Sequence, residues 1–401
     1  MKKLIITLIY FFAFGVINAQ NYNQNLNLKD YAGDVIITSQ VRAERNKAIL
    51  RGTESTKNRG FVLANYTGIQ PSVYPGFNNG FWPKDVPENI NNIKFNTRHL
   101  DELVNWGVQN NFHIIHHCLF FPNKYFPDWF SNSNYSQDDL NRLLVNYISG
   151  VLNANDNKHK IDVFNVINEI FDFGQTGKYR DNGDGNEDCK WMGLGYEKDR
   201  SGLMGESKIN TKHPIFVRKV FETAGQLSEA KLEIRDFNVA FGGKKADGLY
   251  QLVRHLLNSG VRVDAVGFQC HLNTNKDYNY DNFKKNVERF LNLGVEVYIT
   301  ELDVGLNLWN NGKKKIVEDI LKTDKDWELF FKKQKDIYYN IILAAKTSGV
   351  SLISNWGFRD DIPYGNWRKN QKAWLIKKDY SKKEAYYAVL KALHDADLDN
   401  K

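Results

Sequence analysis

The chain of 401 residues is poor in cysteine, with only Cys118, Cys189 and Cys270. Because these three are far apart and odd in number, no disulfide framework can be inferred, and stability must come from packing. Low-complexity segments, internal repeats and collagen-like periodicity are also missing, which excludes disordered and fibrous classes. An apolar content of 42% and a charged content of 25% are typical of a globular protein with a large core.

Long apolar runs are absent beyond the N-terminus. Met1-Lys2-Lys3 precedes an apolar run over residues 4–17 and then Asn18-Ala19-Gln20, the layout of a secretory signal cleaved near Ala19. That run is too short to span a membrane as a mature helix, and no second run of spanning length follows. We therefore expect residues 1–19 to be a signal peptide and the mature chain to be secreted or periplasmic.

Charge of one sign is not concentrated anywhere in the chain. The formal charge of +7 falls to +5 once Lys2 and Lys3 leave with the signal, and the remaining basic residues are interspersed with acidic ones. This pattern indicates a solvated surface and argues against a nucleic-acid partner. No glycine-rich loop follows a predicted strand, which argues against a dinucleotide-binding fold.

Short apolar runs alternate with amphipathic stretches along the chain, which predicts a parallel sheet with covering helices. The predicted strands are residues 60–64, 72–74, 113–117, 163–168, 232–237, 265–271, 295–300 and 351–356. The clearest predicted helices are residues 213–227, 248–257, 281–293 and 327–346. About eight such units with no second composition regime favour a closed (β/α)8 TIM barrel over an open sheet.

The domain organisation follows from this alternation. Residues 20–59 are interpreted as a polar N-terminal leader with the first elements, and residues 60–398 as one (β/α)8 catalytic domain. The irregular stretch 171–211 is the longest departure from the pattern. In a barrel it is an enlarged loop on the face where the strands end.

Two glutamates stand at the ends of buried strands. Glu169 follows Asp162-Val163-Phe164-Asn165-Val166-Ile167-Asn168, and Glu301 follows Val295-Glu296-Val297-Tyr298-Ile299-Thr300. An ionised group in such a place is costly unless it has a partner or a function. Paired carboxylates of this kind are the chemical minimum for cleaving a glycosidic bond.

Side-chain alternation adds polar neighbours to this pair. Residues 265, 267, 269 and 271 share one strand face, which brings Gln269 and His271 to the barrel interior. By the same parity Ile299, Glu301 and Asp303 share a face, with the two carboxylates about 7 Å apart along the strand. His271 can then bridge toward both carboxylates.

Six ordered segments carry a resemblance to a known family. They are Val166-Ile167-Asn168-Glu169, residues 232–238, Val266-Gly267-Phe268-Gln269-Cys270-His271-Leu272, residues 297–304, Asn355-Trp356-Gly357, and residues 379–393. Together they resemble glycoside hydrolase family 10, the retaining endo-β-1,4-xylanases on (β/α)8 barrels. The resemblance runs from about residue 94 to the C-terminus.

The resemblance implies a role for each matching residue. Glu169 is implied as the acid/base and Glu301 as the nucleophile. The other implied site residues, which bind or orient the sugar, are Asn168, Gln269, His271, Asp303, Trp356, Trp367 and His117. Trp367 is the weaker aromatic assignment, because its spacing from Trp356 is longer than usual in the family.

Two regions depart from the family pattern. Phe112 and His116 stand where a histidine and a tryptophan normally contact sugar, and the usual polar segment near the second strand is replaced by aromatic surface at Phe81 and Trp82. Catalytic residues are thus retained while altered sugar recognition is expected.

Three histidines on one strand also suggest a metal site. On an extended strand His113 and His117 lie about 13 Å apart and His116 points to the opposite face, so one ion cannot bind all three. We therefore predict no metal.

The sequence predicts an exported, monomeric glycosidase that cleaves internal β-1,4 bonds of xylan without a cofactor. Two alternatives stay open: the same chemistry on another β-linked plant or algal polysaccharide, and a carbohydrate-binding barrel that turns over weakly or not at all.

Overall fold

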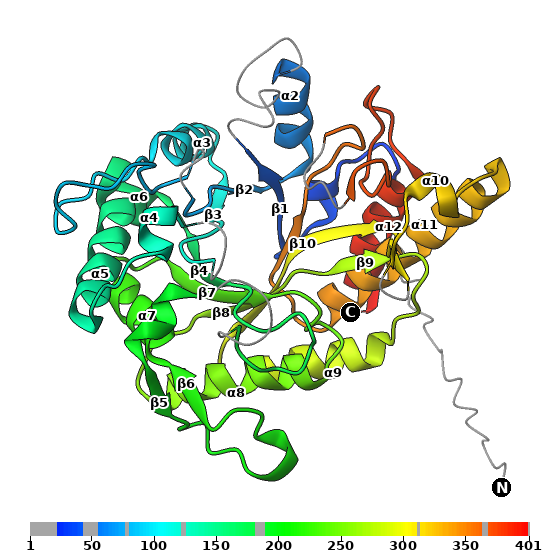
Figure 1. Cartoon of the computed structure of the whole chain (residues 1–401). Coiled ribbons are helices and arrows are strands. Elements are labelled where there is room, and N and C mark those ends of the chain that lie inside the picture. The colour runs from blue at the N-terminus through cyan, green and yellow to red at the C-terminus, as the bar shows by residue number, and fades with distance from the viewer. Residues whose placement is uncertain are drawn as a thin grey trace, which may run out of the picture.

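The computed structural model describes residues 22–42, 55–76, 80–121, 126–180, 189–310, 313–362 and 368–399. Figure 1 shows a ring of strands in the middle of the molecule with helices packed around it. The predicted signal peptide, residues 1–19, lies outside the described residues. In the part that is described, no helix combines the length and apolar character needed to cross a membrane.

The central sheet is a closed barrel of eight parallel strands, as the sequence predicts. Each strand pairs in parallel with the next, and the pairing of β10 with β13 and of β13 with β1 closes the ring. The barrel strands are β1 Ile36–Val41, β2 Gly68–Pro71, β3 His113–His116, β4 Val163–Asn168, β7 Lys231–Asp236, β8 Ala265–Phe268, β10 Glu296–Gly305 and β13 Leu352–Asn355.

The longer helices cover the outside of the barrel. They are α2 Ser55–Asn65, α3 Arg98–Gln109, α5 Gln137–Asn153, α7 Ile215–Leu227, α8 Lys244–Asn258, α9 Tyr280–Leu291, α11 Asp324–Thr347 and α12 Glu384–Asp399. Shorter elements are α4 Asp128–Ser131, α6 Asn157–Lys160, α10 Val317–Ile320, the hairpins β5 Tyr196–Lys198 with β6 Lys212–Pro214 and β11 Trp309–Asn310 with β12 Lys313–Lys314, and β9 His271–Asn273.

Local chemistry sets where these helices begin. Ser136 precedes α5, and its hydroxyl accepts the amide of Asp139 at 3.2 Å while the Asp139 carboxylate accepts the Ser136 amide at 3.1 Å. Thr323 and Asp326 form the same reciprocal box at the start of α11. Each box satisfies amides that the first helical turn leaves without partners.

The barrel interior has an apolar floor and a polar upper half. Ile115, Val163, Ala265, Tyr298 and Leu352 form a small cluster inside the barrel, separate from the large core between strands and helices. Farther along the strands, the fully buried side chains are polar: Gln70, His117, Asn165, Glu233, Arg235, Gln269 and Thr300. Buried polar groups of this density need mutual partners, which marks the upper half as the place to look for function.

One predicted strand is wrong. Residues 60–64 lie inside α2, and the first barrel strand is β1, in the segment interpreted as a leader with the first elements. The apolar run 60–64 was misassigned because a short apolar run fits a helix or a strand equally well. The strand β1 was not predicted because Thr38, Ser39 and Gln40 interrupt its apolar residues with buried polar ones. The weak strand predicted near 72–74 is β2, which ends at Pro71.

The predicted parity of β10 is also partly wrong. Tyr298 belongs to the inner cluster and Ile299 to the outer core, so Ile299 does not share a face with Glu301. The pairing of β10 with β13 shifts register between Ile299 and Leu302. This bulge reverses the alternation and lets both Thr300 and Glu301 face inward.

Candidate functional site

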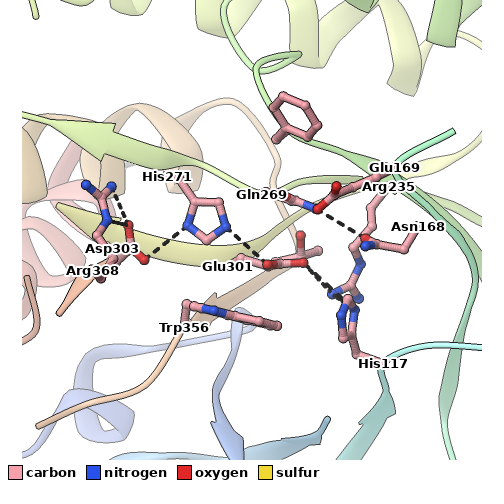
Figure 2. A network of polar contacts seen from close by, with 12 residues as sticks. His117, Asn168, Glu169, Arg235, Gln269, His271, Glu301, Asp303, Trp356 and Arg368 are labelled. Carbon is pink, nitrogen blue, oxygen red and sulfur yellow. Dashed lines mark hydrogen bonds and ion pairs between the residues drawn. The ribbon is translucent and has the colours of Figure 1, made fainter. Parts of the chain in front are cut away.

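The candidate site lies at the carboxyl-terminal ends of the barrel strands. Glu169 directly follows β4, Glu301 lies in the second half of β10, and Gln269 directly follows β8. Parallel strands bring these ends to one mouth of the barrel, where loops are free to vary. Figure 2 shows the side chains from these strands converging in one network of polar contacts.

The two carboxylate oxygens of Glu301 have different surroundings. Oε2 contacts His271 Nε2 at 3.1 Å. Oε1 lies 3.6 Å from Arg235 Nη1 and 3.8 Å from His117 Nδ1, and it is buried without a hydrogen-bond partner among the described residues. Glu301 is therefore held by one oxygen, while the lone pairs of the other remain available.

His271 links Glu301 to a second buried carboxylate. Its Nδ1 contacts Asp303 Oδ2 at 3.0 Å, and the other Asp303 oxygen accepts from Nε and Nη2 of Arg368 at 3.0 and 2.8 Å. Burial alone would lower the pKa of His271, but the carboxylates of Asp303 and Glu301 outweigh it and raise that pKa to about 9. His271 is thus an imidazolium at neutral pH.

Glu169 occupies a left-handed backbone position, with φ of 56°. Its amide donates to the carbonyl of Arg235 at 3.0 Å, which ties the turn after β4 to β7. Its carboxylate accepts from Gln269 Nε2 at 3.1 Å and from Arg180 Nη2 at 2.9 Å. A left-handed non-glycine residue at a strand end is strained, and such strain is common where a side chain must be aimed at a site.

Asn168 and Glu301 leave complementary groups unpaired. Asn168 Oδ1 accepts from Gln269 Nε2 at 3.2 Å, so the Asn168 amide nitrogen is fixed as the outward donor. That nitrogen is buried without a hydrogen-bond partner in the described part of the chain. The amide nitrogen of Asn168 can donate to a ligand oxygen, and the free oxygen of Glu301 can accept from a ligand or attack it.

One of the two predicted aromatic rings, Trp356, lies beside this network. Trp356 packs edge-on against His117 at 5.2 Å and against His271 at 6.1 Å between ring centroids. Burial and the nearby Arg235 lower the pKa of His117 well below its ordinary value, so His117 is neutral. Trp367, the other predicted aromatic residue, lies outside the described residues.

The structure corrects the placement predicted for Phe112 and His116. Phe112 precedes β3 at the opposite end of the barrel and packs against Trp106. His116 is fully buried against Phe81 and Phe164 on the outer side of the sheet, and burial lowers its pKa to about 3. Neither residue contacts the network around Glu301, so their identity does not alter it.

The predicted aromatic surface at Phe81 and Trp82 is a second correction. Both are buried, with exposures of 0% and 1%. Trp82 packs on Phe130 at 5.1 Å and on Tyr147 at 5.2 Å. These rings fill the core between the barrel and its helices, and they offer nothing to a ligand.

Several site residues had escaped prediction. Glu233 and Arg235 alternate with apolar residues in β7, and this charged alternation in a buried strand was a readable sign of a polar interior. Arg180 and Arg368 gave no local sign, because each reaches its carboxylate from a loop. Arg180 belongs to the enlarged loop 171–211, which thereby contacts Glu169.

A cluster away from the barrel mouth has the composition of a metal site. The ligand atoms of Asp199, His213 and His255 lie within 4.8 Å of one another. The amide of Arg200 donates to His255 Nδ1 at 3.0 Å, so Nε2 carries the proton and donates to Glu197 at 3.1 Å. A histidine that binds a metal through Nε2 donates its other ring nitrogen instead. The cluster therefore fits a hydrogen-bonded anchor for the hairpin of β5 and β6.

Comparison with known proteins finds one matching family model and several related enzymes. The model of glycosyl hydrolase family 10 matches residues 77–392. The endo-1,4-beta-xylanase B of Thermotoga neapolitana is 24% identical over 305 residues, which cover 75% of each chain. The exoglucanase XynX of Acetivibrio thermocellus is 27% identical over 78% of this chain, but the match spans only 25% of that longer protein.

Solved structures share the fold. The xylanase 10B of Thermotoga petrophila RKU-1, in complex with xylobiose, superposes with a TM-score of 0.71 at 23% identity, covering 94% of this chain and 99% of that one. The native xylanase 10B of Thermotoga maritima gives the same TM-score of 0.71 at 22% identity, covering 94% and 100%. At this identity the likeness establishes the barrel and leaves the substrate to be argued from the site.

Proposed function

Since this chain belongs to glycosyl hydrolase family 10, we propose that it hydrolyses internal β-1,4-xylosidic bonds of xylan with retention of configuration, with Glu169 as acid/base and Glu301 as nucleophile. The observation that carries the proposal is the unequal environment of the two carboxylates at one barrel mouth. Glu169 is partly open to solvent, with 17% of its side chain exposed, whereas Glu301 is buried with one free oxygen. Acid/base chemistry and nucleophilic attack need these different settings.

The first half-reaction forms a glycosyl ester. Oε1 of Glu301 attacks the anomeric carbon, and the bond from that carbon to the leaving oxygen breaks. Glu169 transfers its proton to the leaving oxygen, which departs as a hydroxyl on the released part of the polymer. Glu301 becomes a neutral ester and Glu169 becomes a carboxylate.

The second half-reaction returns the enzyme to its starting state. Glu169 removes a proton from water as the water oxygen bonds to the anomeric carbon from the side that the leaving group vacated. The ester bond breaks, and its electron pair returns to the oxygen of Glu301. Two inversions give net retention.

The surrounding residues support these steps. The imidazolium of His271 contacts Glu301 through the oxygen that does not attack, and Arg368 fixes Asp303 behind it. A positive charge in this place favours the carboxylate form of Glu301 before attack and after release. The unpaired amide of Asn168 is positioned to bind a sugar hydroxyl near the ester.

The substrate assignment rests on similarity together with the site. Relatives named endo-1,4-beta-xylanase favour xylan, while the relative named exoglucanase keeps another β-linked polymer as the second candidate. Phe112 and His116 lie away from the network around Glu301, so altered sugar recognition stays a prediction, which the polysaccharide panel below tests. A barrel that binds without turnover is disfavoured, because a binder has no use for the buried contacts of His271 on Glu301.

Three further expectations complete the proposal. The layout of residues 1–20 supports export to the periplasm or beyond, which N-terminal sequencing of the mature protein tests. We expect a monomer, which light scattering tests. The two half-reactions use only side chains and water, so activity should survive dialysis against a chelator.

The decisive experiment measures reducing ends released from a panel of β-linked polysaccharides. Wild-type protein should act on xylan, and Glu301→Ala should abolish release while xylan binding is kept. Glu296→Gln is the matched control, since Glu296 lies at the other end of β10 and pairs with Lys231. Binding without release from any polymer would refute the proposal.

The stereochemical course is tested separately. Proton NMR of the first products should show the β-anomer before mutarotation. First products in the α-anomer would refute retention while leaving hydrolysis intact. Release from a polymer other than xylan alone would change the substrate and keep the chemistry.

A further inference from the structure

A buried ion pair lies inside the barrel directly beside Glu301. Glu233 and Arg235 are both fully buried in β7, and two bonds join them: Nε to Oε1 at 2.7 Å and Nη2 to Oε2 at 2.5 Å. Gly267 on the neighbouring strand makes the room, because a Cβ there would lie 2.0 Å from Glu233 Oε1. Burying two charges is unfavourable unless their geometry is fixed.

The remaining arm of Arg235 points toward the catalytic end. Its Nη1 donates to Gln70 Oε1 at 3.2 Å and to His117 Nδ1 at 3.1 Å. These acceptors use both protons of Nη1, and the same nitrogen lies 3.6 Å from Glu301 Oε1. Arg235 therefore attracts the free oxygen of Glu301 without sharing a proton with it.

Glu301 thus has a cation near each oxygen. His271 binds Oε2, while Arg235 approaches Oε1, and His117 beside Arg235 stays neutral. A hydrogen bond from Arg235 would occupy the lone pairs that attack the sugar. Attraction alone orients the oxygen and leaves its lone pairs free.

We propose that Arg235, held in place by Glu233, is a positioning residue for Glu301 that sets the balance between forming and hydrolysing the glycosyl ester. The proposal rests on the function proposed above. When Glu301 becomes a neutral ester, Arg235 loses its attraction to a negative oxygen. Arg235 therefore disfavours the ester relative to the free carboxylate, and Glu233 moderates the effect by neutralising part of the arginine's charge.

The two partners then have opposite effects on the ester. Arg235→Met removes the attraction, so the ester should form readily and break down slowly. Glu233→Gln leaves the arginine less neutralised, so the ester should form slowly and break down quickly. A purely structural ion pair predicts instead that both variants change the two rates in the same direction.

The experiment traps the ester with 2,4-dinitrophenyl 2-deoxy-2-fluoro-β-xylobioside. Attack by Glu301 releases dinitrophenolate, which needs no proton, and the fluorine slows both steps so that the ester accumulates. Intact-protein mass spectrometry follows trapping, and its reversal after the reagent is removed. Breakdown of the ester should be about tenfold slower in Arg235→Met, equal to about 1.4 kcal/mol, and faster than wild type in Glu233→Gln.

Controls separate the possible failures. Arg235→Met leaves Glu233 buried and unpaired, so Glu233→Met/Arg235→Met removes both charges and provides a second test if the single variant does not fold. This double variant should also lengthen the life of the ester, because the charge nearer to Glu301 is lost. Lys383→Met removes a buried cation from its pair with Asp360 and should leave the ester's lifetime unchanged.

Two results distinguish this inference from the function on which it rests. If wild-type protein is never labelled on Glu301, the proposed function fails. If wild-type protein is labelled, and the Arg235 and Glu233 variants keep its ratio of trapping to breakdown or move it in one direction, only the inference is overturned.

Discussion

Raising the pH should remove a specific contribution of His271 to folding. The pKa of this histidine rises from 6.5 to about 9 in the folded protein, because Asp303 and Glu301 outweigh the effect of burial. Between these two values the folded state holds the proton more tightly than the unfolded chain. The stabilisation is therefore fully present below about pH 6.5 and is lost as the pH rises through about 9.

The size of the effect follows from the same two values. Each pH unit between 6.5 and about 9 corresponds to about 1.4 kcal/mol, which gives about 3 kcal/mol of unfolding free energy. Only 17% of the His271 side chain is exposed, so solvent screens the two carboxylates weakly.

Urea denaturation of wild type and His271→Gln from about pH 6 to about pH 10 measures this contribution. Taking the difference between the unfolding free energies of the two proteins cancels the contributions of the lysines and tyrosines that both proteins share. The gap should shrink by about 3 kcal/mol toward high pH. His159→Gln is the matched control, because the contact of His159 with Asp156 is exposed and contributes little to stability. A gap for His271→Gln that stays constant over the whole range would refute the reasoning.

Two further predictions concern Gly267, which lies against Glu233, and Arg180, which binds Glu169. Gly267→Ala should lower the unfolding free energy by about 3 kcal/mol in urea denaturation, since the new Cβ meets Glu233 Oε1 at 2.0 Å. The control Gly60→Ala should show no loss, because nothing lies within 4 Å of a Cβ there. Equal stabilities of the two variants would contradict the packing argument. Arg180→Met should slow hydrolysis of phenyl β-xylobioside far more than hydrolysis of dinitrophenyl β-xylobioside. Arg180 binds the acid Glu169, and dinitrophenolate leaves without a proton from that acid. Equal losses of rate on the two substrates would indicate a structural role for Arg180.

Much of the fold could be read from the sequence because its main signals are local. Strands buried on both faces appear as continuous β-branched runs, as in residues 163–168 and 295–300, and these lie in β4 and β10. The strand β1 was missed because its inward face is polar, so periodicity gave no apolar stripe to recognise.

The candidate site was partly readable for the same reason. Glu169 and Glu301 were predicted from their places at strand ends, and the structure brings both into one network. The contacts of His271 with Glu301 and Asp303 agree with prediction, although Ile299 shows that the assumed parity was wrong. A bulge depends on the pairing of two strands, and one strand's sequence does not display it.

The amino-acid sequence by itself indicated the closed barrel, the end of the barrel that carries the carboxylates and some of the residues from which the network is built. Only the tertiary structure decided which side chains meet: Arg180 on Glu169, Arg368 on Asp303, and Arg235 near the free oxygen of Glu301. The physical reason is that the two kinds of signal act over different ranges along the chain. Hydrophobic periodicity acts between neighbours in the chain, whereas electrostatic partners are chosen by distances that exist only after the barrel has closed.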